Sequence, residues 1–159
     1  MKSELLSLKN AIDKFDEIDL GYPKGEHRIF EQGNLDSVFE LCKHLGISQD
    51  SSLARFYEFC GGIELPDVGN GYYVLSPDEI AVVNTMESEP NTFDGRDIVI
   101  FGSDSGGGRF VIAKDSGDIF YLPMAEVSST REYLGHPVKL EVSGMEGFVL
   151  YLGERVKEQ

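Results

Sequence analysis

The chain has 159 residues, of which 41% are hydrophobic, and a formal net charge of -14. A single domain of this length buries roughly 70% of the surface that its unfolded chain exposes, so we expect a core that needs no disulfide or metal. The excess of carboxylates repels phosphate backbones and argues against direct nucleic-acid binding. No apolar run approaches the ~18 residues of a membrane span, and the N-terminus lacks the apolar region of a signal peptide. We therefore expect one soluble, cytoplasmic domain over residues 1–159.

The first sixty residues have the apolar spacing of three amphipathic helices. The first helix ends before Gly21 and leads into a long connection with room for a short strand. The second begins after Asn34 or Asp36 and ends at Gly46, a residue type suited to a left-handed C-terminal turn. The third helix ends at the glycine pair Gly61-Gly62.

Two further helices are predicted by their N-terminal caps. Ser76, followed by a proline and then by Glu79, has the form of a capping box and predicts a short helix over 77–83, directly after a strand over 72–75. The segment from Ser143 to Glu146 has the same form and predicts a terminal helix that reaches Val156. The polar segment 86–96 between the two reads as an exposed loop.

Three short apolar runs in the middle of the chain predict an antiparallel meander. They span 98–101, 110–113 and 119–122, are rich in β-branched and aromatic residues, and are joined by tight connections. We expect the first connection to be a structural turn built by four glycines, Gly102, Gly106, Gly107 and Gly108. Strands grouped between helices predict an α+β fold, in which an antiparallel meander carries helices packed on one face.

Two motifs resemble the SUKH superfamily, the Smi/Knr-type proteins. One is the run FGSDSGGG over 101–108, followed by a strand and a Asp-Ser-Gly-Asp turn, and the other is the helix over 53–59 that ends in Cys60-Gly61-Gly62. The resemblance covers about 45–152, whereas residues 1–32 form a helix and loop atypical of the family. It departs from the family at Cys60, where Asn is frequent, and at Gly108, where an acidic residue is frequent. The resemblance implies a SUKH-like fold.

Residues that could carry catalysis lack the partners that catalysis needs. Ser103 and Ser105 do not form the G-x-S-x-G turn of a hydrolase. Cys42 and Cys60 have no metal-ligand spacing to each other or to a histidine, and we expect them to be buried free thiols. We therefore expect no catalytic residue, no metal and no cofactor, and a chain that is not an enzyme.

Negative charge is concentrated in the middle third of the sequence. Residues 61–108 contain nine acids and one base, a balance of -8 out of -14. Such a sector would steer a basic protein toward itself, and the alternative is an acidic surface that only keeps the chain soluble. The residues expected to bind this partner include two tyrosines as possible aromatic anchors: Glu64, Asp67, Tyr72, Tyr73, Asp78, Glu79, Asp94, Asp97 and Asp104. For each tyrosine, packing in the core is the favoured alternative to partner contact.

The SUKH resemblance implies a non-enzymatic protein-binding module. Bacterial members of the superfamily act as immunity proteins that neutralise a cognate toxin, in many cases a nuclease, by direct contact. A nuclease must be basic to hold its substrate, which agrees with an acidic inhibitor. The alternative is a regulatory scaffold, as in the fungal relatives that influence cell-wall synthesis. A third possibility is an anion nest formed by the amides of the glycine turn, which the charges of Asp97 and Asp104 oppose.

Overall fold

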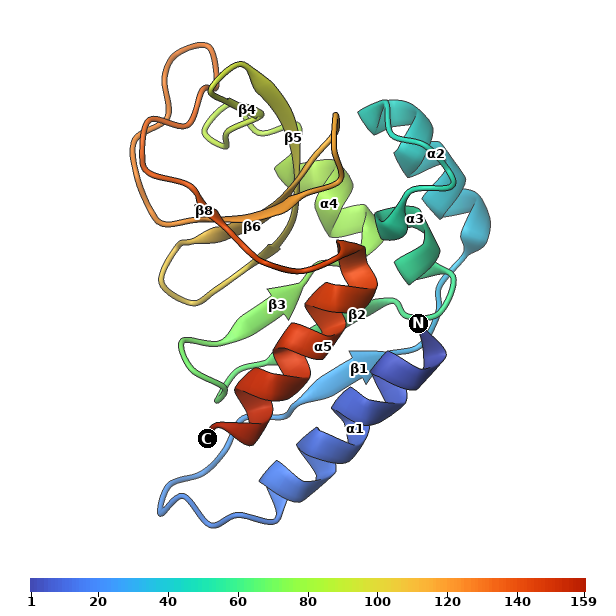
Figure 1. The fold of residues 1–159 in the computed structure, drawn as a ribbon, viewed down its shortest axis with the longest axis vertical. Coiled ribbons are helices and arrows are strands. Elements are labelled where there is room, and N and C mark those ends of the chain that lie inside the picture. The colour runs from blue at the N-terminus through green and yellow to red at the C-terminus, as the bar shows by residue number, and fades with distance from the viewer.

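Eight antiparallel strands form one sheet that follows the chain nearly in sequence order. The computed structural model describes all residues, 1–159 (Figure 1). The strand order is β1-β2-β3-β5-β6-β7-β8, and the short β4 pairs with β5 outside this path. The strands are β1 (Arg28–Phe30), β2 (Gly62–Leu65), β3 (Tyr72–Val74), β4 (Thr92–Phe93), β5 (Arg96–Ser103), β6 (Arg109–Ala113), β7 (Ile119–Leu122) and β8 (Val138–Lys139). The predicted antiparallel meander and the α+β class are confirmed.

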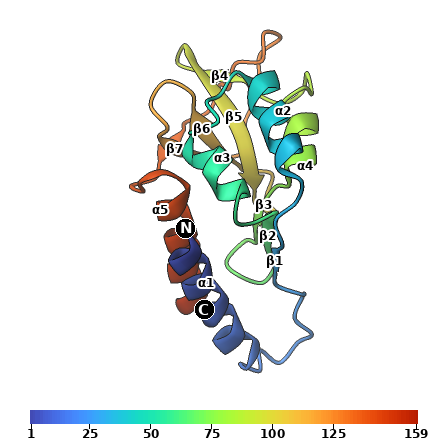
Figure 2. The ribbon, with the colours of Figure 1, turned by 90° about the vertical axis from the view of Figure 1, so that its right-hand side faces the viewer.

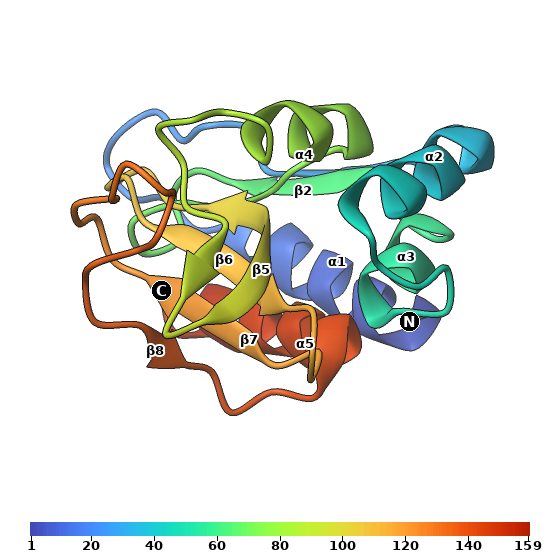
Figure 3. The ribbon, with the colours of Figure 1, turned by 90° about the horizontal axis from the view of Figure 1, so that it is seen from above.

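Five helices accompany the sheet. They are α1 (Lys2–Asp16), α2 (Leu35–Leu45), α3 (Ser52–Tyr57), α4 (Pro77–Val83) and α5 (Gly144–Lys157). Helices α1 and α5 lie side by side and run in the same direction on one face, as the expected helical layer (Figure 1). Helix α4 lies beside the edge of β5, next to α2 (Figures 2 and 3), and its buried Ile80 belongs to the same core cluster as the other helices. No helix is both long enough and apolar enough to cross a membrane.

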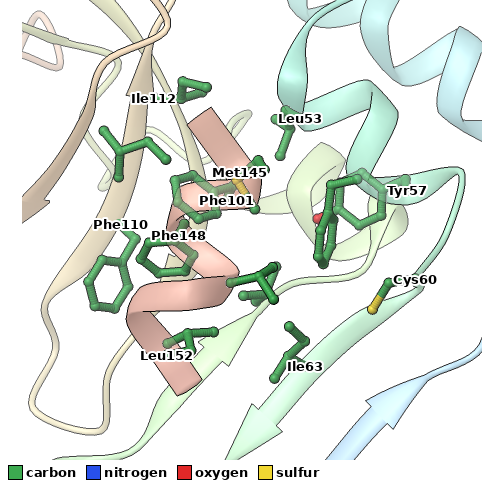
Figure 4. Close-up of a cluster of buried hydrophobic side chains, with 14 of the residues drawn as sticks. Leu53, Tyr57, Cys60, Ile63, Phe101, Phe110, Ile112, Met145, Phe148 and Leu152 are labelled. Carbon is green, nitrogen blue, oxygen red and sulfur yellow. The ribbon is translucent and has the colours of Figure 1, made fainter. Parts of the chain in front are cut away.

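Most of the core lies between the sheet and the helices. This cluster of 28 buried residues includes side chains from every helix. Figure 4 shows its centre, where Phe101 of β5 and Phe110 of β6 meet Phe148 of α5. The rings of Phe101 and Phe148 are 5.1 Å apart in an edge-to-face arrangement, a favourable geometry for aromatic pairs. A second cluster of eight buried residues covers the other face of β5–β7 and includes Phe93 of β4.

Local sequence signals set most element boundaries. Gly46 ends α2 in the left-handed conformation with φ of 67°, as predicted. The Ser76 side chain and the Glu79 side chain form the predicted capping box of α4. The predicted capping box of α5 is wrong, because the Ser143 side chain makes no capping hydrogen bond. The backbone turns at Gly144 with φ of 61°, and the Oγ of Ser52 in α3 instead accepts the Met145 N–H at 3.1 Å.

The segment 86–96 is not a simple loop. It contains β4, which pairs with β5 through a two-residue turn at Asp94 and Gly95, both with positive φ. An Asp-Gly pair is the preferred sequence for such a hairpin turn. The sheet therefore gains a short strand at this position.

One edge of β5 is shared by a strand and a helix. Strand β3 pairs with Gly102 and Ser103 of β5 and ends at Val74. Beyond this point, the side chain of Asn84, at the end of α4, takes the place of a neighbouring strand. Its amide donates to the Ile100 carbonyl at 2.8 Å, and its Oδ1 accepts the Ile100 N–H at 2.9 Å. This replacement holds α4 against the sheet.

We predict that Asn84→Ala destabilises the fold by about 2 kcal/mol, because two backbone groups of Ile100 lose their partner. Urea unfolding measures the free-energy change. The matched control is Asn10→Ala on the exposed side of α1, which should change stability by less than about 0.5 kcal/mol. Equal stability of the two variants would show that Asn84 does not hold α4 to β5.

Candidate functional site: an acidic groove beside α4

Four carboxylates line a groove of about 520 Å³ between the β2–β3 pair and α4. They are Glu31, Glu64, Asp78 and Glu79, and we call this hollow the acidic groove. Figure 2 shows α4 above β2 and β3, next to α2 and β5. No lysine, arginine or histidine lines the groove. The groove therefore presents a surface of one sign of charge.

The element that positions each carboxylate follows from the local sequence. In β2 the buried Ile63 and Leu65 face the core, so Glu64 between them faces the opposite side. Asp78 and Glu79 belong to the first turn of α4, where acidic side chains complement the helix dipole. Glu31 directly follows β1.

The groove carboxylates make no ion pair within the chain. Arg28 lies opposite Glu64 in the register of β1 and β2, but its guanidinium pairs with Glu26. Glu79 accepts the Ser76 N–H as part of the capping box at 3.2 Å. Asp78 is exposed and bonds to no other side chain. These charges are consequently free to interact with a cation from outside the chain.

The structure separates the other predicted acids from the groove. Asp67 accepts the Gly25 N–H at 2.6 Å, and its carboxylate lies 3.7 Å from the Nε2 of the buried His27. This carboxylate ties the 17–27 connection to the end of β2. Asp67 therefore has a structural role.

Asp94 and Asp97 lie at the far end of β5. Both are exposed, and neither lines the acidic groove. Asp97 lies six residue steps along the extended strand from the groove residue Ser103, which is roughly 20 Å. The acidic sector of the sequence is thus not one continuous surface.

Asp104 supports the turn between β5 and β6. Its Oδ1 accepts the N–H groups of Gly106 and Gly108 at 2.9 and 2.8 Å, and its Oδ2 accepts the Tyr121 hydroxyl at 2.6 Å. The turn amides that could have formed an anion nest are occupied by this carboxylate. The possibility of an anion nest at this turn is therefore not supported.

Only one of the four predicted turn glycines needs a left-handed backbone. Gly107 has φ of 86° at the tip of the turn. Gly106 precedes it, and Gly108 follows it against the Tyr121 hydroxyl, where a Cβ would clash. Gly102 does not lie in the turn. It lies within β5, where a Cβ would come within 2.6 Å of the Tyr73 carbonyl oxygen.

The two predicted tyrosines of β3 point to opposite faces of the sheet, because neighbouring strand residues alternate. Tyr73 lines the acidic groove and is half-buried. Tyr72 packs on the helical side, where its ring lies 6.2 Å from that of Tyr151 in α5. Of the two predicted tyrosines, only Tyr73 therefore lies in the groove.

Sequence reasoning missed Glu31 as a groove residue. It lies outside the acidic middle third, in the segment between the first two predicted helices. The chain places it beside Gly61 and Gly62, where a Cβ on Gly61 would clash with the Glu31 carbonyl. The glycine pair was the available signal in the sequence, because glycines in a strand often mark the close approach of another backbone.

Comparisons with known proteins assign no family to the chain. No protein-family model matches it, and no curated protein matches it.

Both cysteines are buried free thiols, as predicted. Burial raises the pKa of Cys42 and raises that of Cys60 to about 11. A protonated thiol is a poor nucleophile. Nor does any group of three or more His, Cys, Asp or Glu side chains lie in positions that could hold a metal ion.

We predict that dithionitrobenzoate modifies the native chain at least about a hundredfold more slowly than the urea-unfolded chain, since both thiols are protonated and inaccessible. Absorbance of the released thiolate gives the rates. The single variants Cys42→Ala and Cys60→Ala assign each rate to one thiol. Rapid modification of either cysteine in the native chain would contradict the burial described here.

Proposed function

We propose that the chain is a non-enzymatic protein-binding module whose acidic groove receives a cationic surface of another protein. The observation that carries this proposal is the convergence of Glu31, Glu64, Asp78 and Glu79 without a basic lining residue. Charges of one sign in a hollow focus the electrostatic field and accelerate association with an oppositely charged partner. The net charge of -14 adds long-range attraction of the same sign.

We further propose that the module is of the SUKH type and acts as an immunity protein against a basic toxin. Both motifs that carry the resemblance contribute to the groove, Ser103 from the run over 101–108 and Gly61 and Gly62 from the end of the helical motif. A toxin that cleaves nucleic acid needs a cationic surface for phosphates. Carboxylates placed where those phosphates lie would occlude that surface.

A regulatory scaffold is the second candidate, favoured by an apolar surface beside the groove. Val82 on α4 and Met86 just after it are 63% and 45% exposed. They line a shallow hollow of about 400 Å³ that shares Asp78 and Glu79 with the groove. Binding through this surface would depend mainly on apolar burial and would be insensitive to salt.

Neutralising the groove should slow the capture of a basic partner. In the variant Glu31→Gln/Glu64→Gln/Asp78→Asn, Glu79 is left intact because it caps α4. We expect its association rate to fall about tenfold at low salt, and we expect wild-type association to slow between about 0.05 M and about 0.5 M salt. The measurement is capture of a basic protein from the source cells, followed by binding kinetics on the purified pair.

The matched control removes three charges outside the groove, in Glu87→Gln/Asp94→Asn/Asp97→Asn. These side chains are exposed and unpaired, so this variant should bind like the wild type. For the immunity role, the captured protein should kill cells that lack this chain. Equal weakening by both variants would show that the net charge of the chain, and not the groove, drives association. Salt-independent binding would favour the scaffold.

A further inference from the structure

A second pocket lies on the other face of β3 and takes no part in the proposed function. It has a volume of about 280 Å³, at the lower end of the range of small-molecule sites. Its lining combines aromatic rings with a single carboxylate and contains no basic residue: Tyr72, Phe110, Tyr121, Tyr151, Val138 and Asp104. The pocket is therefore distinct from the acidic groove in position and in chemistry.

Four aromatic rings line the pocket. The ring of Phe110 lies 5.9 Å from that of Tyr72 and 5.2 Å from that of Tyr121. Figure 4 shows Phe110 beside Phe148 of the core, which anchors this wall. Aromatic rings attract cations through the negative potential of their faces. An anion would meet both this potential and the charge of Asp104.

Asp104 has capacity for one further hydrogen bond. A carboxylate offers about four acceptor positions, and the two glycine amides and the Tyr121 hydroxyl occupy three of them. No lysine, arginine or histidine forms an ion pair with it. Burial and the neighbouring Asp104 raise the pKa of Tyr121 to about 12, so the phenol stays a donor at neutral pH.

The molecule already holds one cation against these aromatic residues. The guanidinium of Arg155 lies 5.2 Å over the ring of Tyr151 and also binds Glu158. Arg155 does not line the pocket. Of the remaining rings that line the pocket, Tyr72 and Tyr121 are partly exposed and Phe110 is buried behind them.

We propose that this pocket binds an alkylammonium cation, the group that ends a lysine side chain and that small primary amines also carry. A guanidinium needs a two-oxygen acceptor for its fork, whereas Asp104 has one acceptor position left. A single ammonium N–H matches that position, and its alkyl chain matches the aromatic and aliphatic wall.

The test is an NMR titration of the isotope-labelled chain with N-acetyl-lysine methylamide. Its matched neutral probe is N-acetyl-norleucine methylamide, which has the same chain length without the ammonium group. We expect saturable shifts at Asn70, Gly71 and Tyr121, with the lysine probe at least about tenfold tighter than the norleucine probe. Butylamine distinguishes the sources: equal affinity indicates a free amine, and weaker binding indicates a lysine within a polypeptide.

Two variants address the carboxylate and the rings separately. Asp104→Asn keeps the Oδ1 acceptor for the turn amides and should weaken the lysine probe about tenfold. Asp97→Asn removes the same charge outside the pocket and should have no effect. Tyr72→Leu leaves the turn between β5 and β6 untouched and should also weaken binding of the lysine probe. If Asp104→Asn does not fold, unchanged binding in Tyr72→Leu overturns the proposal.

Equal affinity for lysine and norleucine probes would overturn the proposal, as would unchanged lysine binding in Asp104→Asn or the absence of saturable shifts. The groove variant Glu31→Gln/Glu64→Gln/Asp78→Asn should bind the lysine probe like the wild type. Failure of the pocket is thereby distinguished from failure of the proposed function.

Discussion

The end of β3 at Val74 is the constraint on which the acidic groove depends. A strand that continued would cover the edge of β5 and leave no room for α4. Because Asn84 satisfies the Ile100 backbone instead, the chain turns at Ser76 into a helix beside the sheet. The first turn of that helix then carries Asp78 and Glu79 next to Glu64 of β2. The concentration of charge is thus a consequence of backbone hydrogen bonding.

The alternation of side chains along β3 separates the two proposed recognition surfaces. Tyr73 faces a groove whose carboxylates form no ion pair within the chain, and Tyr72 faces an aromatic pocket with one carboxylate. Long-range attraction by the groove acts through many charges and is weakened by salt. The proposed contact in the pocket depends on one partly exposed acceptor, Asp104, and on ring geometry. Both surfaces favour positive charge, although they lie on opposite faces of the sheet.

Short-range signals in the sequence predicted the elements well, whereas the site depended on contacts between distant segments. The cap at Ser76, the terminator at Gly46 and the meander needed only neighbouring residues. The predicted cap of α5 was wrong, because Ser52, from another helix, supplies the acceptor for the Met145 N–H. The sequence grouped acids by their position in the chain, and the strands then separated them: Asp97 lies roughly 20 Å along β5 from the groove. The opposite error, the omission of Glu31, has the same cause.

Hydrogen–deuterium exchange on the chain alone and bound to its captured partner tests the role of the acidic groove most directly. Binding in the groove predicts slower exchange in β2, over Gly62–Leu65, and in α4, over Pro77–Val83. The other edge of the sheet, at β7 and β8, should exchange as in the free chain. Protection confined to β7 and β8, with β2 and α4 unchanged, would contradict binding through the groove.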